Sequence, residues 1–199
     1  MLNPAKYRDL SDQELMRRWC KGEKRACEEL YRRYSTKLYS YFRRMLGEDH
    51  RAEDLLHDAF VKIVTRPALY NPDRSFRVWI FSVAHNLCCN ELRRAGLRRV
   101  TEVKCDLSAF ASEPPQAEKR LDGEYFRLAL FDALSRVDEE VRSAFLLRFQ
   151  QELTIREISD ALGRPEGTIR SRLFYLTRRL GVSLRAFRYF AVEDQNGTA

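Results

Sequence analysis

Residues 154–180 read TIREISDALGRPEGTIRSRLFYLTRRL, and this stretch decides the architecture of the C-terminal part of the chain. Thr154 followed three residues later by Glu157 is a capping box, which predicts that a helix begins there. Gly163 suits the end of that helix, and Pro165 suits the first turn of the next one. Apolar residues recur at helical spacing on both sides of the turn, and we expect them to be buried: Ile155, Ile158, Ala161, Leu162, Ile169, Leu173, Leu176 and Leu180.

The second of these two helices is strongly basic. Seven arginines and a single acid, Glu166, lie between Gly163 and Tyr189. A third helical segment, DEEVRSAFLLRFQ at 138–150, precedes the pair and completes the plan of a helix-turn-helix domain. In such domains the second helix enters the major groove, where arginine is the usual reader of guanine. The alternative is a helical hairpin with a solvated basic face, and the pattern favours DNA binding.

The composition of the whole chain agrees with a folded protein that binds a polyanion. Of its 199 residues 44% are hydrophobic and 33% charged, and the formal net charge is +7. No apolar run approaches the roughly 20 residues of a membrane span. The N-terminal stretch has no signal-peptide core, so we expect a cytoplasmic protein. The five cysteines form no CxxC pair, so we expect reduced thiols.

Helical periodicity covers most of the chain, and alternation typical of strands is almost absent. Ser11, with Glu14 three residues on, predicts the start of a first helix. The periodicity is lost after Gly96, where Pro114 and Pro115 fall in a polar stretch. We therefore predict an all-α protein of two small helical domains joined by a flexible linker, the second a helix-turn-helix domain. The expected divisions are an N-terminal domain at 1–96, the linker at 97–117, the C-terminal domain at 118–190 and a disordered tail at 191–199.

Three motifs resemble those of one protein family. AEDLLHDAFVKI at 52–63 and FRVWIFSVAHNLCCNELRR at 76–94 resemble the N-terminal domain of bacterial extracytoplasmic-function (ECF) sigma factors, which belong to the sigma-70 family. PEGTIRSRL at 165–173 is similar to the signature of their C-terminal domain. The resemblance covers about residues 12–95 and 120–182. It implies a dissociable subunit of bacterial core RNA polymerase, with no enzymatic activity or cofactor of its own.

The resemblance also implies which residues bind what. The N-terminal domain would dock on core polymerase, and would recognise and open the −10 promoter element. The C-terminal domain would read the −35 element. Family members are commonly held by an anti-sigma factor, which makes such a protein an expected partner. The implied core polymerase contacts are Glu53, Asp54, His57 and Asp58. The implied −10 contacts are Arg74, Ser75, Phe76, Arg77, Asn86, Arg93 and Arg94. The implied −35 contacts are Thr168, Arg170, Ser171, Arg172, Phe174, Tyr175 and Arg178.

Two of these positions depart from the family pattern. His57 stands where the family often has glutamine, and Tyr175 stands where many members carry arginine. Phe76 also belongs to the apolar stripe of its helix, and for Trp79 we favour a core role over stacking on a base. For His85, Cys88 and Cys89 we favour burial of the cysteines in the helix core over a metal site, because no residue nearby in the sequence supplies a fourth ligand.

The sequence also allows two other functions. One is a stand-alone helix-turn-helix regulator, in which the N-terminal half senses a signal or forms a dimer. The other is a DNA-processing enzyme, which is disfavoured because the chain shows no nucleophile or carboxylate–metal motif. A regulator would footprint an operator without polymerase, whereas a sigma factor needs core polymerase to give promoter-specific transcripts.

Overall fold

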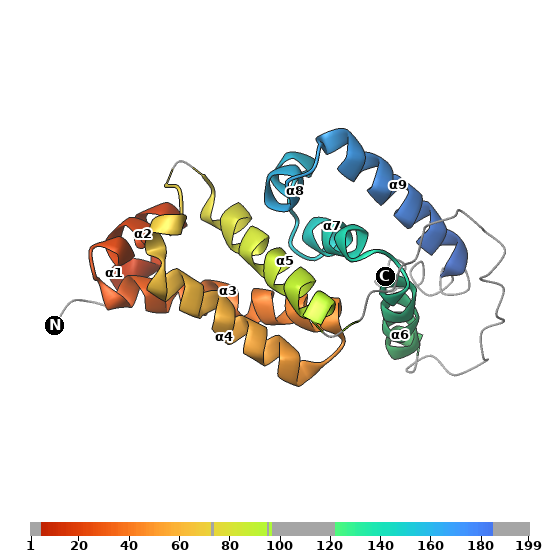
Figure 1. Ribbon diagram of the computed structural model, residues 1–199, viewed down its shortest axis with the longest axis horizontal. Helices are drawn as coiled ribbons and strands as arrows, with labels where there is room; N and C mark the ends of the chain where they lie inside the picture. Colours follow the sequence, from red (N-terminus) through yellow and green to blue (C-terminus); the bar gives the residue numbers. More distant parts are fainter. Residues whose placement is uncertain (1–4, 73, 95, 97–121, 185–199) are drawn as a thin grey trace, which may run out of the picture.

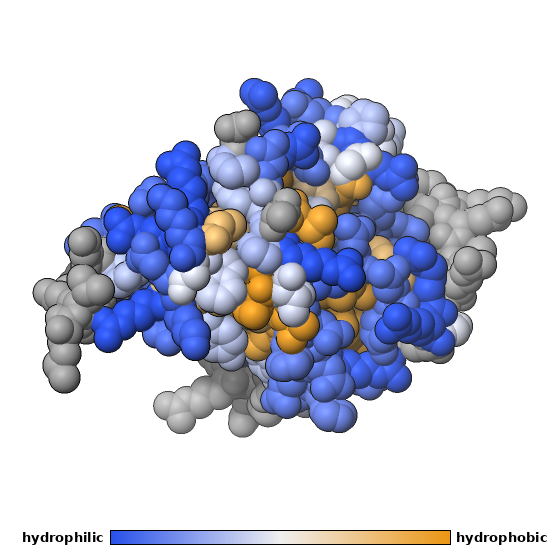
Figure 2. All heavy atoms as spheres, turned by 60° about the vertical axis from the view of Figure 1, so that its left-hand side comes forward, coloured by the Kyte–Doolittle hydropathy of each residue, from blue (hydrophilic) through white to orange (hydrophobic). Residues whose placement is uncertain are grey.

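The computed structural model describes residues 5–72, 74–94, 96 and 122–184. The predicted linker at 97–117 and the predicted tail at 191–199 lie outside these residues. Within the described residues all regular structure is helical, which confirms the all-α prediction. None of the described helices combines the length and the apolar composition that crossing a membrane requires. The surface in Figure 2 is mostly hydrophilic, and hydrophobic atoms gather near its middle.

The N-terminal domain is built around the long helix α3. Its elements, in chain order, are α1 (Ala5–Arg8), α2 (Asp12–Cys20), α3 (Lys24–Leu46), α4 (Asp49–Thr65), the 3-10 turn η1 (Pro67–Leu69) and α5 (Phe76–Arg94). Helices α2, α4 and α5 all contact α3 or one another (Figure 1). Ser11 caps α2 by accepting a hydrogen bond from the Glu14 amide, as predicted. Gly47 ends α3 at a φ of 80°, a left-handed conformation that favours glycine.

The C-terminal domain has the predicted helix-turn-helix. Its helices are α6 (Asp122–Ser135), α7 (Glu139–Phe149), α8 (Ile155–Leu162) and α9 (Glu166–Ser183). Thr154 and Glu157 form the predicted capping box at the start of α8, and Gly163 ends that helix in the left-handed region. Pro165 is the N-cap of α9 rather than its first helical residue, one position earlier than predicted. Ile169, Leu173, Leu176 and Leu180 are buried, as their spacing predicts.

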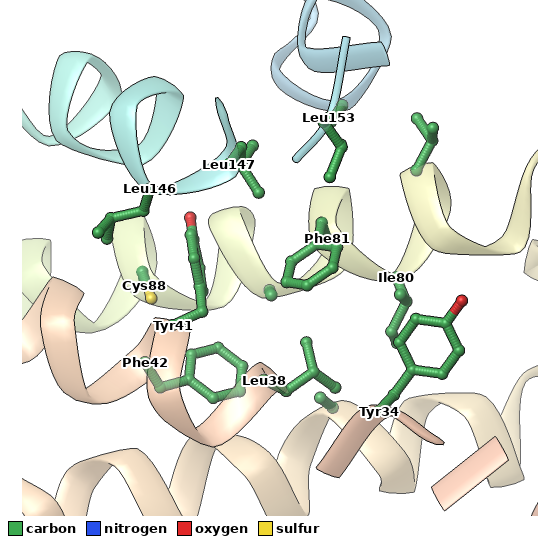
Figure 3. Packing of buried hydrophobic residues seen from close by; sticks show 14 of the residues in the cluster. Tyr34, Leu38, Tyr41, Phe42, Ile80, Phe81, Cys88, Leu146, Leu147 and Leu153 are labelled. Carbon is green, nitrogen blue, oxygen red and sulfur yellow. The ribbon is translucent and has the colours of Figure 1, made fainter. Parts of the chain in front are cut away.

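The two domains share one hydrophobic core. Helix α5 lies between α3 on one side and α7 on the other (Figure 3). Phe81 and Cys88 of α5 belong to the same buried cluster as Leu146 and Leu147 of α7. Helix α5 also contacts α8, the first helix of the helix-turn-helix. The docked domains therefore bury apolar surface that each would expose alone.

Polar contacts fix the register of this docking. The hydroxyls of Tyr41 and Ser143 lie 2.7 Å apart, and neither residue is exposed. Arg142 donates one hydrogen bond to the Met45 carbonyl and others to the carbonyls of Ser135, the last residue of α6, and of Val137. A Cβ at Gly47 would lie 2.9 Å from the ring of Phe131, so the end of α3 and α6 approach closely. The partner of the buried Tyr41 lies in the other domain, which the spacing of residues within α3 does not predict.

Candidate nucleic-acid interface

Helix α9 presents a continuous exposed face. Because α7 and α8 cover its leucine stripe, the residues one or two positions along point to solvent. Five of the seven predicted −35 contacts are exposed there: Arg170, Ser171, Phe174, Tyr175 and Arg178. Thr168 is half-buried, and its carbonyl accepts a hydrogen bond from the Ser171 hydroxyl. The exposed face begins in the first turn of α9, where recognition helices meet base edges.

Arg170 and Arg172 have different surroundings, although nothing in their sequence positions separates their expected roles. The Arg170 side chain is 71% exposed, and its ion pair to Glu166 is loose at 3.9 Å. Arg172 turns toward α7, where its Nη1 donates to Oε1 of Glu140 at 2.5 Å. Arg170 is therefore the arginine in the first turns of α9 that can reach a groove without breaking a close ion pair.

The loop before α5 is held by an aromatic cluster. The rings of Tyr70, Phe76 and Trp79 lie 5.4–5.7 Å apart, mostly edge to face. The Tyr70 hydroxyl donates to the Arg74 carbonyl at 2.7 Å, which ties the loop to this cluster. Trp79 is half-buried among these rings, in agreement with the core role that its apolar surroundings suggested.

The predicted −10 contacts separate into exposed and buried residues. Asn86, Arg93, Arg94 and Arg74 are exposed, and Ser75 and Arg77 are half-buried. Phe76 has no exposed surface, because it packs against Tyr34 and Tyr70 in the core. The structure therefore brings Phe76 to the core rather than to the DNA-facing surface, and its inward place in the apolar stripe was the better guide.

An acidic surface lies on α4. Glu53, Asp54, His57 and Asp58 are all exposed, while Ala52, Leu55 and Ala59 of the same helix are buried. The helix is therefore amphipathic, with its polar residues facing solvent. Arg51, Asp54, His57, Asp58 and Glu91 line a shallow hollow between α4 and α5.

Exposed apolar residues extend this surface toward the end of α4, which the sequence interpretation missed. Val61 and Val64 are exposed on α4, Leu69 on η1, and Tyr31 on α3. Tyr31 stacks at 4.7 Å on Phe60, whose own side chain is buried. Val61 and Val64 fall outside the spacing of the buried stripe, and that mismatch was the available signal. We call the exposed residues Glu53, Asp54, His57, Asp58, Val61, Val64, Leu69 and Tyr31 the α4 surface.

The His85 and cysteine cluster is a packing feature. Cys88 and Cys89 are buried, and the Cys89 sulfur lies 3.5 Å from Nε2 of His85. Burial raises the pKa of Cys89 to about 11 and lowers that of His85, so both groups are neutral near pH 7. No group of three or more metal-ligating side chains occurs among the described residues.

The comparisons with known proteins agree with this geometry. The family model of sigma-70 region 2 matches residues 30–98, and that of sigma-70 region 4 matches residues 127–174. The chain is 30% identical over 159 residues to the ECF RNA polymerase sigma factor SigL of Mycobacterium tuberculosis, which covers 78% of this chain and 87% of that protein. It is 25% identical over 170 residues to the RNA polymerase sigma-H factor of Pseudomonas aeruginosa, which covers 82% of this chain and 88% of that factor.

Two solved structures share the fold at 20% sequence identity. One is CnrH in complex with the cytosolic domain of CnrY, with a TM-score of 0.66 over 88% of this chain and 97% of that chain. The other is the sigma factor RpoE in complex with the anti-sigma factor NepR from Bartonella quintana, with a TM-score of 0.61 over 79% of this chain and 96% of that chain. Taken with the two matched regions and the 30% identity to SigL, the arrangement of α1–α9 shows that the chain belongs to the ECF sigma factors of the sigma-70 family.

Proposed function

We propose that this sigma factor directs core RNA polymerase to its promoters through three surfaces. The exposed face of α9 reads the −35 element, α5 and the loop before it bind the −10 element, and the α4 surface docks on core polymerase. One observation carries the proposal: a basic recognition helix and an exposed acidic helix face occur on one chain. The proposed divisions remain 1–96, 97–117 and 118–190, with a tail at 191–199.

The charges of α4 and α9 assign them to different partners. An exposed cluster of Glu53, Asp54 and Asp58 repels phosphates, so it does not suit DNA. It does suit a basic protein surface, and the exposed valines beyond it add apolar area that a protein interface can bury. The α4 surface therefore supports a protein partner, which for this family is core polymerase.

Helix α5 carries the groups that promoter opening requires. The Asn86 amide is exposed, and it can both donate to and accept from a base edge. Arg93 and Arg94 extend from the last turn of the same helix and can pair with phosphates. Holding an unstacked base takes polar contacts to its edge and basic contacts along the strand. These exposed residues support −10 binding by α5 without any contribution from the buried Phe76.

An anti-sigma factor is the second partner that we propose. CnrH is solved with the cytosolic domain of CnrY, and RpoE with the anti-sigma factor NepR. Both share this chain's fold, and we place this protein with its polymerase in the cytoplasm. The anti-sigma factor would compete for the surfaces that bind polymerase or promoter DNA.

Transcription with purified components tests the proposal. Core polymerase with this chain should give run-off transcripts from a genomic promoter library, whereas core polymerase alone should not. A charge reversal on the α4 surface, Asp54→Lys with Asp58→Lys, should abolish transcripts and binding to core polymerase. Reversal of the exposed Glu152, between α7 and α8, is the matched control and should leave core binding intact. Sequence-specific footprints without polymerase, together with no transcripts, would instead identify a stand-alone regulator.

A further inference from the structure

We propose that Glu140 is a positioning residue for the recognition helix, and that it holds Arg172 away from the bases. The inference rests on the proposed −35 role of α9 and deepens it, because it names the residue that fixes the orientation of that helix. Glu140 lies in the first turn of α7, outside the helix-turn-helix pair itself. In the sequence its charge suits the start of α7, but no local pattern marks it as a partner of Arg172.

One carboxylate oxygen of Glu140 accepts hydrogen bonds from two arginines, one in the turn between α8 and α9 and one on α9. Oε1 accepts from Nη1 of Arg172, on α9, at 2.5 Å. The same oxygen accepts from Nε of Arg164, in the turn between α8 and α9, at 3.0 Å. Glu140 therefore links three segments, α7, the turn and α9, at one point.

The surroundings of this carboxylate strengthen the link. The Glu140 side chain is only 14% exposed, so water competes weakly for its oxygens. Its place in the first turn of α7 also suits the positive end of the helix dipole. The hydrogen bond to Glu140 raises the pKa of Arg164, as expected for a cation held by a carboxylate. Low exposure and the helix dipole therefore favour a firmly held Glu140 carboxylate, and the raised pKa shows that Arg164 is one of the cations it holds.

Arg172 is therefore occupied, and Arg170 is the reader. Arg172 is 38% exposed and bonded to a carboxylate, whereas Arg170 is 71% exposed with a 3.9 Å ion pair. Two-pronged recognition of guanine requires the guanidinium plane to meet O6 and N7 at a fixed angle. A rotation of α9 would misdirect Arg170, and the Glu140 link opposes that rotation. Glu140 thus sets specificity through α9 without touching DNA.

Salt dependence of DNA binding separates this role from direct contact. Each arginine that pairs with a phosphate adds about 0.9 to the slope of log K against log salt. The probes are a duplex enriched from a randomised −35 library by holoenzyme and a scrambled duplex of equal length, each bound to holoenzyme assembled with the full chain. Arg172→Met should leave the slope unchanged, because Arg172 does not pair with DNA. Glu140→Gln should steepen it by about 0.9 for each arginine that it frees.

Sequence discrimination supplies the second readout. Glu140→Gln and Arg172→Met should each lower the preference for the enriched duplex by roughly tenfold. The double variant should lose little more than either single one, because both changes break the same link. Glu139→Gln is the matched control, since it removes the same charge from the same turn. Glu139 forms no ion pair within the described ranges, so its variant should keep the discrimination of the native protein.

Two results would overturn the proposal. The first is a Glu140→Gln variant that discriminates as well as Glu139→Gln does. The second is an Arg172→Met variant whose slope falls by about 0.9, which would make Arg172 a DNA contact. If Glu140→Gln does not fold, Arg172→Met alone still decides between the two roles. Failure of the native holoenzyme to enrich any −35 sequence would instead refute the proposed function.

Discussion

The hydroxyl oxygens of Tyr41 and Ser143 lie 2.7 Å apart in the core, although 102 positions separate them in the chain. Tyr41 belongs to α3 of the N-terminal domain, and Ser143 to α7 of the C-terminal domain. Both are fully buried, and burial raises the pKa of Tyr41 well above its ordinary value. The pair is a polar contact inside an otherwise apolar domain interface, so each hydroxyl depends on the other for its hydrogen bond.

Removal of one hydroxyl should therefore destabilise the docked protein. Ser143→Ala leaves the Tyr41 hydroxyl buried without its partner, which costs about 1–3 kcal/mol. The double variant Tyr41→Phe with Ser143→Ala should cost less than the sum of the single changes, because no orphaned group remains. Urea unfolding measures both. Tyr39→Phe is the control, because the Tyr39 hydroxyl bonds Asp49 at the exposed surface. If the losses of unfolding free energy in the two single variants simply add in the double variant, the two hydroxyls do not stabilise each other.

The docked arrangement should open on a promoter. The −10 and −35 elements lie about 25 base pairs apart, roughly 85 Å along straight duplex. A compact body the size of the described residues is only roughly 40 Å across, and α5 directly contacts α8. Fluorophores at the exposed Asn90 of α5 and Asp160 of α8, two helices that contact each other, should show efficient energy transfer in the free protein and weak transfer in the promoter complex. Transfer that stays efficient in an active promoter complex would contradict this expectation.

Local features of the fold were predictable because their signals are short-range. The capping box of Thr154 and Glu157, the Ser11 cap and the left-handed Gly163 all act within one helical turn. The docking of the two domains was not predictable. Periodicity marks Tyr41 as buried, but it cannot say that the covering group is Ser143.

The candidate site shows the same limit. The exposed face of α9 and the acidic face of α4 follow from the spacing of the buried residues between them. The pairing of Arg172 with Glu140 joins positions 32 apart, so no local pattern encodes it. For Phe76 the family resemblance implied a −10 contact, whereas the apolar stripe of its helix predicted a core residue. The side chain is buried, so the second prediction is the one the structure supports. Tertiary contacts, rather than local spacing, separated the arginine held by a carboxylate from the arginine that we propose as the reader of DNA.

Glu29 should make stability depend on acid pH. Its side chain is nearly buried and binds Arg32 and Arg33, which lower its pKa from 4.5 to about 2. A carboxyl whose folded pKa is depressed stabilises the fold above its unfolded pKa, and that contribution is lost as pH falls from about 4.5 to about 2. Its size should be about 2 kcal/mol, because both arginines remain partly in solvent.

Glu29→Gln tests this dependence. The variant should melt roughly 5 °C below the native protein at pH 7, and the difference should shrink as pH falls toward 2. Glu53→Gln, on the exposed α4 surface, serves as the control and should show little difference at any pH. A melting difference for Glu29→Gln that stays constant between pH 5 and pH 2 would exclude this linkage.

Asn86→Ala should impair promoter opening more than initial binding. The amide is exposed on α5, and we propose that it contacts an unstacked base, which duplex DNA does not present. Permanganate footprinting of the holoenzyme should show less opening, while closed-complex affinity stays within roughly twofold. A promoter melted beforehand at the −10 element should restore transcription. Asn90→Ala, at an exposed position one turn further along the same helix, is the control. Failure of the melted template to restore activity would place Asn86 in another step.

Arg170→Ala should relax the choice of base at one −35 position. Loss of a two-pronged arginine–guanine contact costs about 1–3 kcal/mol of discrimination, which corresponds to roughly 5- to 150-fold. Holoenzyme selection from a library randomised at the −35 element measures that preference position by position. Arg156→Ala, exposed on α8, controls for the loss of a positive charge near the DNA. Because a phosphate contact is blind to sequence, equal losses on all −35 sequences would reassign Arg170 to the DNA backbone.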